Sequence, residues 1–398
     1  MEYENNQNLC NFIAQKIIEN PDHRITFADY MNWVLYHPEY GYYTVNQSQF
    51  GAAGDFVTSP YFGSDFGEML AEQFFQMWEI LDYPNPFTLV EMGAGQGLLA
   101  RDILLYLKKQ YPEFYSKINY IICEKSAFLK QQQQKQLKNQ LNLNLSIQWC
   151  DLETLQNEAI IGCFFSNELV DAFPVHQVIV QNHQLQEIYI TVDSEDSTDI
   201  KFKETIGELS TVKIIDYFKL IDIDLCSNIY PEGYRTEVNL VALDWIKTLS
   251  SKLNQGFILT VDYGYQAQRY YLPSRCEGTL QCYYQHRHHN DPYINIGKQD
   301  LTAHINFTAL ERYGEHYNLH PQGFTQQALF LMALGLGDRI ATLSQPSEYS
   351  ISEVLQRRDC LHSLIDPMGV GNFGVLLQSK GLSLSQQPIP LKGFNIPL

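Results

Sequence analysis

The sequence has little of what marks secreted, membrane-spanning or nucleic-acid-binding proteins. Its eight cysteines form no C-x-x-C pair, and several lie in apolar stretches, which indicates reduced structural thiols. No apolar run approaches the roughly 20 residues of a membrane-spanning helix. The N-terminus is polar and acidic and carries no signal-peptide pattern. We therefore expect a cytoplasmic protein without a membrane span.

Basic residues are also scarce. The chain has 27 Lys and Arg against 45 Asp and Glu, which gives a formal net charge of −18. A surface that binds a nucleic-acid backbone needs clusters of Lys and Arg, so no nucleic-acid partner is expected. The charge is compatible with a small molecule or with a basic protein segment, and it does not choose between them. The 398 residues exceed one average domain, which predicts a core domain with large insertions or an added subdomain.

The stretch 87–109 combines a short apolar strand, a glycine turn and an amphipathic helix. Gly93, Gly95 and Gly97 allow a sharp turn and a close approach of the backbone to a ligand. The N–H groups at the start of the following helix point to the same place, which suits a carboxylate or a phosphate. One interpretation is a nucleotide-like cofactor site, and the other is an ordinary strand–turn–helix connection.

The spacing of the glycines indicates which cofactor to expect. A dinucleotide-binding turn has the pattern G-x-G-x-x-G. This chain instead has E-x-G-x-G-x-G from Glu91 to Gly97, and Leu98 occupies the position of the third glycine. The pattern resembles the first motif of class I S-adenosylmethionine-dependent methyltransferases. That cofactor has no pyrophosphate, but it has a ribose whose hydroxyls need an acceptor.

Acidic residues follow the next two predicted strands. Glu124 ends the strand 118–123, where it is placed to hold the ribose hydroxyls. The strand 145–150 is followed by Asp151 and Leu152, where an adenine amino group is commonly held. Three consecutive strand ends that carry a glycine turn and two carboxylates are a more specific signal than the turn alone.

Strands and helices alternate from residue 86 to about 175, which predicts an α/β fold with a mostly parallel, Rossmann-like sheet. A last strand that arrives from the C-terminus suits the antiparallel edge of a class I methyltransferase sheet. We expect a helical N-terminal extension with a lid loop at 1–85, the cofactor-binding half at 86–175, an inserted substrate subdomain at 176–255 and the remainder at 256–398. The insertion is predicted because two strands of one sheet lie too far apart in sequence for an ordinary loop.

A polar segment with Asn167, Glu168 and Asp171 follows the predicted strand 160–166. Ligands of open α/β sheets bind beyond the carboxyl ends of the strands, so these side chains are placed for substrate. The simpler interpretation is that Asn167 caps a helix whose first turn contains Glu168. We favour the substrate role because the glycine turn occupies the same edge of the sheet.

A glycine-rich loop precedes the helix that is predicted to begin near residue 66. Gly54, Thr58 and Ser59 give this loop a flexible backbone and polar groups. It is either a surface turn that caps the helix or a lid over the amino-acid end of the cofactor. In the second case Gly54, Thr58 and Ser59 contact the cofactor.

The loop 278–308 is polar and aromatic and contains clustered histidines. His288 and His289 are adjacent and cannot easily face one ion from a strand, and no cysteine has zinc-finger spacing. We therefore expect no metal site here. A hydrogen-bonding active-site loop is the better interpretation, and it contains the candidates Asp300 and His304.

Several segments, in order from about residue 20 to residue 380, together resemble the MidA-like family of class I methyltransferases. This family includes the arginine methyltransferase of mitochondrial complex I assembly. The matching segments are residues 30–31, 37–43, 54–60, 66–68, 91–97, 166–171, 261–264 and 300–304. The resemblance implies S-adenosylmethionine as cofactor, bound by the loop 51–59, residues 91–97, Glu124 and Asp151. One departure is Asn306, which stands where the family often has Asp and weakens any role for this position as a base.

The resemblance further implies a protein arginine substrate, in the family's known case a subunit of NADH dehydrogenase. Arginine has a pKa above ~12, so a carboxylate beside the guanidinium would orient it and accept its proton. Glu168 and Asp171 are the candidates, with Asn167 as an orienting group, and they share one helical face if the turn is helical. Asp300 and His304 are further candidates for substrate binding. A small-molecule methyltransferase and a non-catalytic assembly factor stay open as alternatives, and so does a homodimer.

Overall fold

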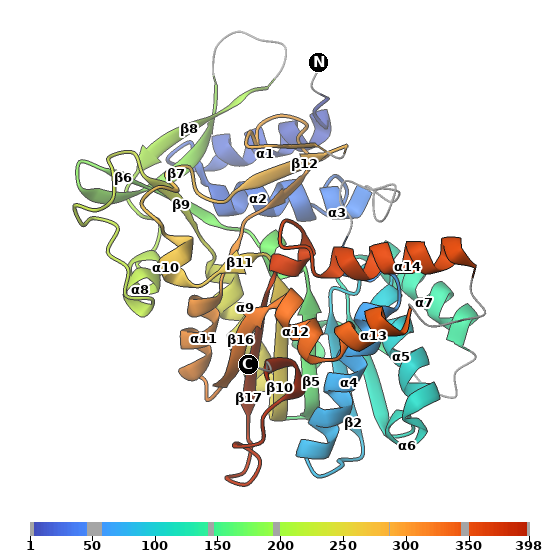
Figure 1. Ribbon diagram of the computed structural model, residues 1–398. Helices are drawn as coiled ribbons and strands as arrows, with labels where there is room; N and C mark the ends of the chain where they lie inside the picture. The colour runs from blue at the N-terminus through green and yellow to red at the C-terminus, as the bar shows by residue number, and fades with distance from the viewer. Residues whose placement is uncertain are drawn as a thin grey trace. The chain divides into compact units, whose positions relative to one another are not determined.

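The computed structural model describes residues 4–45, 58–141, 147–193, 200–285, 287–343 and 350–395 (Figure 1). The chain forms two compact units, each built from three separate stretches of sequence. Unit 1 contains Met1–Phe56, Val170–Trp245 and Gly264–Arg312, and unit 2 contains Val57–Leu169, Ile246–Tyr263 and Tyr313–Leu398. Within the described ranges, no helix is both long and apolar enough to cross a membrane. The expected division into four consecutive segments stays a prediction.

Unit 2 is organised around a seven-stranded sheet with the strand order β16-β17-β10-β5-β2-β3-β4 (Figure 1). In chain order its strands are β2 (Phe87–Met92), β3 (Ile118–Cys123), β4 (Ile147–Cys150), β5 (Ile160–Asn167), β10 (Leu253–Asp262), β16 (His320–Gln326) and β17 (Gly374–Lys380). The pairs from β10 to β4 are parallel, whereas β17 is antiparallel to both β10 and β16. The predicted α/β fold, with a mostly parallel sheet and an antiparallel C-terminal strand, is confirmed.

The helices of unit 2 pack apolar side chains against this sheet. They are α4 (Asp65–Ile80), α5 (Leu98–Gln110), α6 (Pro112–Tyr115), α7 (Ala127–Leu141), α12 (Gln327–Ala333), α13 (Leu336–Thr342) and α14 (Ile351–Leu364). In α4, Phe66, Met69 and Phe74 recur at helical spacing and are fully buried in the core. Every residue of β2 is buried, as expected for a strand with parallel neighbours on both sides. Burial of β2 holds the glycine turn that follows it in place.

Unit 1 combines the N-terminal helices with three small sheets. The helices are α1 (Gln7–Glu19), α2 (Phe27–Tyr36), α3 (Tyr42–Val45), α8 (Lys213–Leu220) and α10 (Ala267–Tyr270), and α9 (Leu240–Lys252) and α11 (Phe307–Glu315) contain residues of both units. One sheet contains β1 (Ile25–Thr26), β6 (His176–Gln181), β7 (Gln184–Val192), β8 (Phe202–Gly207) and β9 (Arg235–Val238). The others pair β12 (Gln281–Tyr284) with β13 (Arg287–His289) and β14 (Asp300–Thr302), and β11 (Gly264–Tyr265) with β15 (Ile305–Asn306).

Local sequence signals correctly predicted several boundaries. The hydroxyl of Thr26 accepts from the N–H of Asp29 at 3.1 Å and so caps α2. The alternating pattern of residues 176–192 predicts a hairpin with its turn at Asn182 and His183. Strands β6 and β7 form this hairpin, and the two turn residues have φ of 52° and 56°. Asn tolerates this left-handed conformation better than most residues, which explains the turn.

Composition and apolar patterning predict the local structure of three further segments in part. The polar residues 131–140 are predicted to be a solvated helix end or a loop, and they form the C-terminal part of helix α7. The apolar pattern predicts a helix over 324–334, but the helix begins at Gln327, because Phe324 pairs with Leu376 in the sheet. The segment 193–235 is predicted to be irregular apart from a helical stretch near 214–221; α8 confirms this stretch, whereas the strands β8 and β9 were not predicted.

Candidate cofactor and substrate site

The glycine turn joins β2 to α5 in unit 2. Gly93, Gly95 and Gly97 have φ of 69°, 51° and 79°, which is the left-handed region that favours glycine. A Cβ on Gly93 would lie 2.7 Å from Cδ1 of Leu169, so the Leu169 side chain would have to shift to admit it. A Cβ on Gly95 would meet no atom within 4 Å. Gly95 therefore borders a space that a ligand can enter.

Helix α5 begins directly after this turn and has no side-chain cap. Its N-cap residue is Gly97, which has no side chain to accept a hydrogen bond from the first turn. The first N–H groups of a helix lack partners inside the helix and carry a partial positive charge. They are therefore suited to bind the carboxylate at the amino-acid end of a ligand.

The sheet register brings the predicted strand-end residues to one edge. Met92 of β2 pairs with Cys123 of β3, and Cys123 pairs with Cys150 of β4. The residues that follow these three partners are Gly93, Glu124 and Asp151. Because all three strands are parallel, the glycine turn and the two carboxylate residues lie side by side at the carboxyl edge of unit 2.

Glu124 is a buried carboxylate of this edge. It is 8% exposed, its Oε1 accepts from the N–H of Ser126 at 2.9 Å, and its Oε2 accepts from Nε2 of Gln133 at 3.1 Å. Burial raises the pKa of Glu124, and these two donors oppose the rise by stabilising the ionised form. Each carboxylate oxygen has a second lone-pair direction, so Glu124 can still accept a hydrogen bond from a ligand hydroxyl.

Asp151 and Leu152 lie at the end of β4, where Leu152 begins a short 3-10 helix, η2 (Leu152–Thr154). The carboxylate of Asp151 is 62% exposed and lies 3.9 Å from Nζ of Lys130. The carbonyl of Asp151 accepts from the N–H and the hydroxyl of Thr154. The side chain of Asp151 is thus open to solvent, whereas its backbone is fixed.

Glu91 lies inside the sheet rather than at its edge. It is 3% exposed, and its Oε2 accepts from the hydroxyl of Tyr120 at 2.7 Å. Burial raises the pKa of Glu91 to about 7. The hydrogen bond from Tyr120 opposes this rise, and the nearby charge of Glu124 adds to it. Near neutral pH this position therefore exchanges between a charged and a neutral carboxyl group.

Asn167 ends β5 and Glu168 follows it at the same edge, since Ser166 pairs with Met92. Glu168 has φ of 50°, an uncommon conformation for a residue with a side chain. Its N–H donates to the carbonyl of Val261 at 2.9 Å, and its Oε1 accepts from Nδ2 of Asn167 at 3.0 Å. The turn is therefore not helical at Glu168, and the predicted shared helical face of Glu168 and Asp171 does not exist.

Asp262 is a residue of this edge to which the sequence analysis gave no role. It is fully buried at the end of β10, and its carboxylate accepts from the N–H of Leu169 at 3.1 Å and of Tyr263 at 2.8 Å. It thereby ties the end of β5 to the end of β10. Since Leu169 also contacts Gly93, Asp262 supports the glycine turn. The signal in the sequence was an acidic residue directly after a long apolar strand.

Gln133 is the second residue without an assigned role. It is fully buried in α7, although it lies in a run of glutamines, and it hydrogen-bonds Gly95 and Glu124. Its spacing of four residues from Leu129 and from Leu137, which are also buried, places it on the inner face of the helix. This spacing was the signal that the glutamine-rich composition concealed.

Part of the predicted lid falls outside the described residues. Gly54 belongs to that part. Thr58 precedes a 3-10 helix, η1 (Ser59–Phe62), and its side chain does not cap it. Ser59 is buried, its hydroxyl donates to Oε1 of Gln327 at 3.1 Å, and its N–H donates to Oε1 of Glu168 at 3.3 Å. Ser59 thus contacts a predicted catalytic residue, while cofactor contacts of this loop stay a prediction.

The other predicted catalytic residues belong to unit 1. Asp300 is fully buried, and the hydroxyl of Tyr43 donates to its two oxygens at 2.9 and 3.1 Å. The carbonyl of Asp171 accepts from the N–H of Ala303 at 2.9 Å, which brings Asp171 and the β14 segment together. Burial, with a smaller contribution from Arg275, lowers the pKa of His304 to about 4. His304 is therefore a neutral hydrogen-bonding group at neutral pH.

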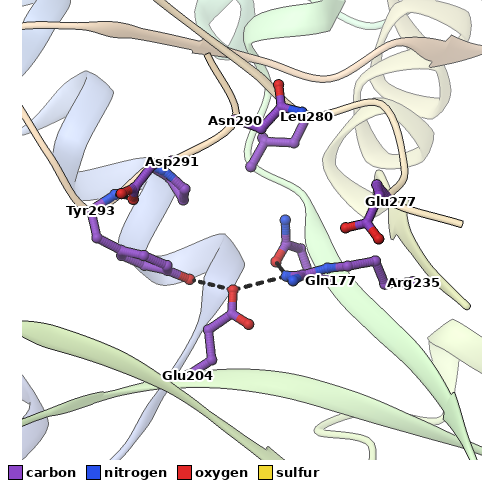
Figure 2. A pocket seen from close by; sticks show the side chains of 9 residues that line it. Gln177, Glu204, Arg235, Glu277, Leu280, Asn290, Asp291 and Tyr293 are labelled. Carbon is purple, nitrogen blue, oxygen red and sulfur yellow. Dashed lines mark hydrogen bonds and ion pairs between the residues drawn. The ribbon is translucent and has the colours of Figure 1, made fainter. Parts of the chain in front are cut away.

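Unit 1 also contains a cavity of about 310 Å³ (Figure 2). On its wall, Nη2 of Arg235 donates to Glu204 and to Gln177, both at 2.8 Å, and the hydroxyl of Tyr293 donates to Glu204 at 2.9 Å. These groups satisfy one another. None of the predicted site residues lines the cavity, so it adds none to the candidate site.

The edge of unit 2 fits the chemical groups of S-adenosylmethionine. Gly95 borders open space, the start of α5 offers N–H groups for a carboxylate, and Glu124 offers an acceptor for hydroxyls. A comparison with protein families agrees with this fit. The model of a family of S-adenosyl-L-methionine-dependent methyltransferases matches residues 69–325, more than half of the chain. The chain belongs to this family.

Relatives of this methyltransferase extend the similarity to almost the whole chain. The Drosophila melanogaster protein named protein arginine methyltransferase NDUFAF7 homolog, mitochondrial, is 27% identical over 93% of this chain and 85% of its own length. The Homo sapiens protein named protein arginine methyltransferase NDUFAF7, mitochondrial, is 26% identical over 90% of this chain and 81% of its own. The predicted family and the methyltransferase activity are confirmed.

A solved structure supports the cofactor of this methyltransferase. A Burkholderia thailandensis protein crystallised with S-adenosyl-homocysteine superimposes with a TM-score of 0.82. It is 28% identical, and the alignment covers 98% of this chain and 94% of that chain. S-adenosyl-homocysteine is what S-adenosylmethionine becomes when its methyl group is transferred. The prediction of S-adenosylmethionine as cofactor is confirmed.

Proposed function

We propose that this methyltransferase transfers the methyl group of S-adenosylmethionine to an arginine of a protein substrate. The observation that carries the proposal is the carboxylate of Glu168, which is held beside the glycine turn because its Oε1 accepts from Nδ2 of Asn167 and from the N–H of Ser59. The backbone of Glu168 is fixed separately, since its N–H donates to the carbonyl of Val261. A fixed carboxylate is the group that a guanidinium needs as a partner. The two relatives named protein arginine methyltransferase support the same substrate class.

The proposed chemistry uses few groups of the chain. The bound cofactor supplies an electrophilic methyl group on its sulfonium. Gly95 and the start of α5 hold the amino-acid end, and Glu124 accepts from the ribose hydroxyls. Glu168 accepts N–H hydrogen bonds from the guanidinium, which turns one nitrogen toward the methyl group and localises the positive charge away from it. As the N–C bond forms, the bond between the methyl carbon and sulfur would break with its electron pair left on sulfur, which gives S-adenosyl-homocysteine. Glu168 accepts the proton that the methylated nitrogen releases.

The proposal extends to the partner. The family resemblance implies a subunit of an NADH dehydrogenase-type complex, and the formal charge of −18 is compatible with a basic segment of such a subunit. A role in complex I assembly would follow. The cytoplasmic location and the homodimer stay predictions beside it, while the names of the relatives above give a mitochondrial location for those proteins. Sedimentation of the purified chain tests the homodimer.

Transfer of a labelled methyl group tests the substrate class. Purified protein and S-adenosylmethionine labelled in the methyl group are incubated with a cell lysate, and the products are separated by size. Label in protein that yields methylarginine on hydrolysis supports the proposal. Label in small metabolites alone, or no transfer despite cofactor binding, contradicts it and indicates a small-molecule enzyme or a non-catalytic assembly factor.

The variant Glu168→Gln tests the role of the carboxylate. We expect transfer to fall by about 10²-fold or more, because the acceptor of the proton is lost. Affinity for S-adenosyl-homocysteine should stay within about twofold, because Glu168 acts on the substrate and not on the cofactor. Glu113→Gln, at an exposed position in α6, is the matched control and should leave both unchanged. Unchanged transfer by Glu168→Gln would remove Glu168 from the mechanism.

A further inference from the structure

The amide of Gln133 connects three segments of the cofactor edge. Its Nε2 donates to the carbonyl of Gly95 at 2.8 Å and to Oε2 of Glu124 at 3.1 Å. Its Oε1 accepts from Nε1 of Trp149 at 2.9 Å. These partners lie in the turn after β2, directly after β3, and in β4. One side chain therefore joins the glycine turn, the ribose carboxylate and the strand that leads to Asp151.

The orientation of this amide is fixed by chemistry. The indole N–H of Trp149 is a donor only, so it must face the oxygen of Gln133. The nitrogen then faces the carbonyl oxygen of Gly95 and Oε2 of Glu124, and it donates to both. Both N–H bonds of the amide are used. An amide with the opposite orientation would leave two donors facing each other at Trp149.

A purely structural residue would not need these properties. The same face of α7 carries Leu129 and Leu137, so an apolar residue at position 133 would continue its packing. Gln133 instead buries a polar group that is costly unless every hydrogen bond is made. Its partners lie in the glycine turn, directly after β3 and in β4, which are the segments that form or lead to the predicted cofactor site.

We propose that Gln133 is a positioning residue that holds the Glu124 carboxylate, relative to the Gly95 turn, in the orientation that accepts the ribose hydroxyls of S-adenosylmethionine. This inference rests on the proposed function, in which Glu124 binds the ribose. With Ser126 on Oε1 and Gln133 on Oε2, the carboxylate is held at both oxygens. Without Gln133 the Oε2 oxygen loses this donor, and the group can rotate away from the ribose.

The variant Gln133→Met tests this role, because methionine has a similar length and cannot hydrogen-bond in this way. The probes are S-adenosyl-homocysteine and its 2′,3′-dideoxy analogue, and calorimetric titration gives the dissociation constants. We expect about tenfold weaker binding of S-adenosyl-homocysteine, the scale of one hydrogen bond to a charged group. Binding of the dideoxy analogue should be unchanged, because it has no hydroxyls for Glu124 to accept. Equal loss for both ligands would indicate a structural role and overturn the proposal.

Three further variants complete the test. Gln134→Met, on the exposed face of the same helix, is the matched control and should bind both ligands as the natural protein does. Glu124→Gln should show the same selective loss as Gln133→Met, and the double variant should lose little more, because the two residues act as one unit. Trp149→Phe keeps Gln133 but removes the donor that orients its amide, and it should show a smaller selective loss.

The outcomes separate the inference from the proposed function. If Glu124→Gln loses affinity selectively while Gln133→Met and Trp149→Phe bind like the natural protein, the positioning role is wrong and the ribose site stands. If Glu124→Gln binds S-adenosyl-homocysteine normally, the ribose site itself is wrong and the role of Gln133 falls with it. If Gln133→Met does not fold, the affinities of Trp149→Phe decide. An equal loss of affinity for both ligands in Trp149→Phe would overturn the positioning role of Gln133.

Discussion

Replacing Glu91 by glutamine tests how the buried strand β2 responds to pH. Glu91 is 3% exposed and accepts from the hydroxyl of Tyr120 at 2.7 Å. Its pKa rises from the ordinary value of 4.5 to about 7, mainly because burial removes the hydration of the charged form. Glutamine has nearly the same shape and keeps an oxygen for Tyr120, but it cannot ionise. The variant therefore removes the charge and little else.

The direction of the effect follows from the two pKa values. Below pH 4.5 the carboxyl group is neutral in the folded and the unfolded protein, and burial carries no penalty for charge. Between pH 4.5 and about 7 the unfolded state loses its proton first, which favours unfolding. Above about pH 7 the group is charged in both states and the penalty is complete. The pKa difference corresponds to about 3 kcal/mol of folding free energy.

Unfolding in urea at a series of pH values measures this penalty. Between pH 5.5, which is above the isoelectric point near 5.0, and pH 8, the stability advantage of Glu91→Gln over the natural protein should grow by about 2 kcal/mol. Tryptophan fluorescence gives the midpoints, and Glu113→Gln is a control for replacing an exposed glutamate. An advantage that does not change with pH, or a variant that is less stable at pH 8, would refute the burial argument for Glu91.

Two further predictions concern the glycine turn and the thiol pair at the sheet edge. The variant Gly95→Ala should bind S-adenosyl-homocysteine at least tenfold more weakly, because its Cβ would enter the open space beside the turn. It should lose about 1 kcal/mol of stability, because φ at this position is left-handed. The variant Gly93→Ala should lose more stability, because its Cβ would also overlap the side chain of Leu169. Thermal melting gives the stability of each variant, and calorimetric titration gives its affinity for S-adenosyl-homocysteine. If both variants lose the same affinity and the same melting temperature, Gly95 does not border the ligand as we expect. The hydrogen bond with the Cys123 thiol lowers the pKa of Cys150, so alkylation of Cys150 by iodoacetamide should accelerate at a lower pH than alkylation of an ordinary thiol. Peptide mass spectrometry measures the rate, and a rate that rises only above pH 8 would contradict it.

The sequence was sufficient for the parts of the fold that rest on local patterns. Continuous apolar strands followed by Gly93, Glu124 and Asp151 predicted a parallel sheet with three polar strand ends, and the register places them at one edge. Thr26 marked the start of α2 through its hydroxyl. In these cases the residue that gives the signal also makes the interaction.

Features that depend on distant partners were not predictable. Gln133 lies in a run of glutamines, and only its partners in the glycine turn, directly after β3 and in β4 distinguish it from its neighbours. The helix α12 begins later than its apolar pattern suggests, because Phe324 pairs with Leu376. Glu168 adopts a left-handed backbone that is fixed by Val261, a residue almost a hundred positions later. No window of sequence contains both members of such pairs.

A crystal structure of this protein with S-adenosyl-homocysteine tests the central claim most directly. The account predicts the ribose hydroxyls within hydrogen-bonding distance of the Glu124 carboxylate and the amino-acid carboxylate at the N–H groups that begin α5. It also predicts that the backbone of Gly95 contacts the ligand without an intervening side chain. A ligand bound away from Glu124 and the glycine turn would contradict the account.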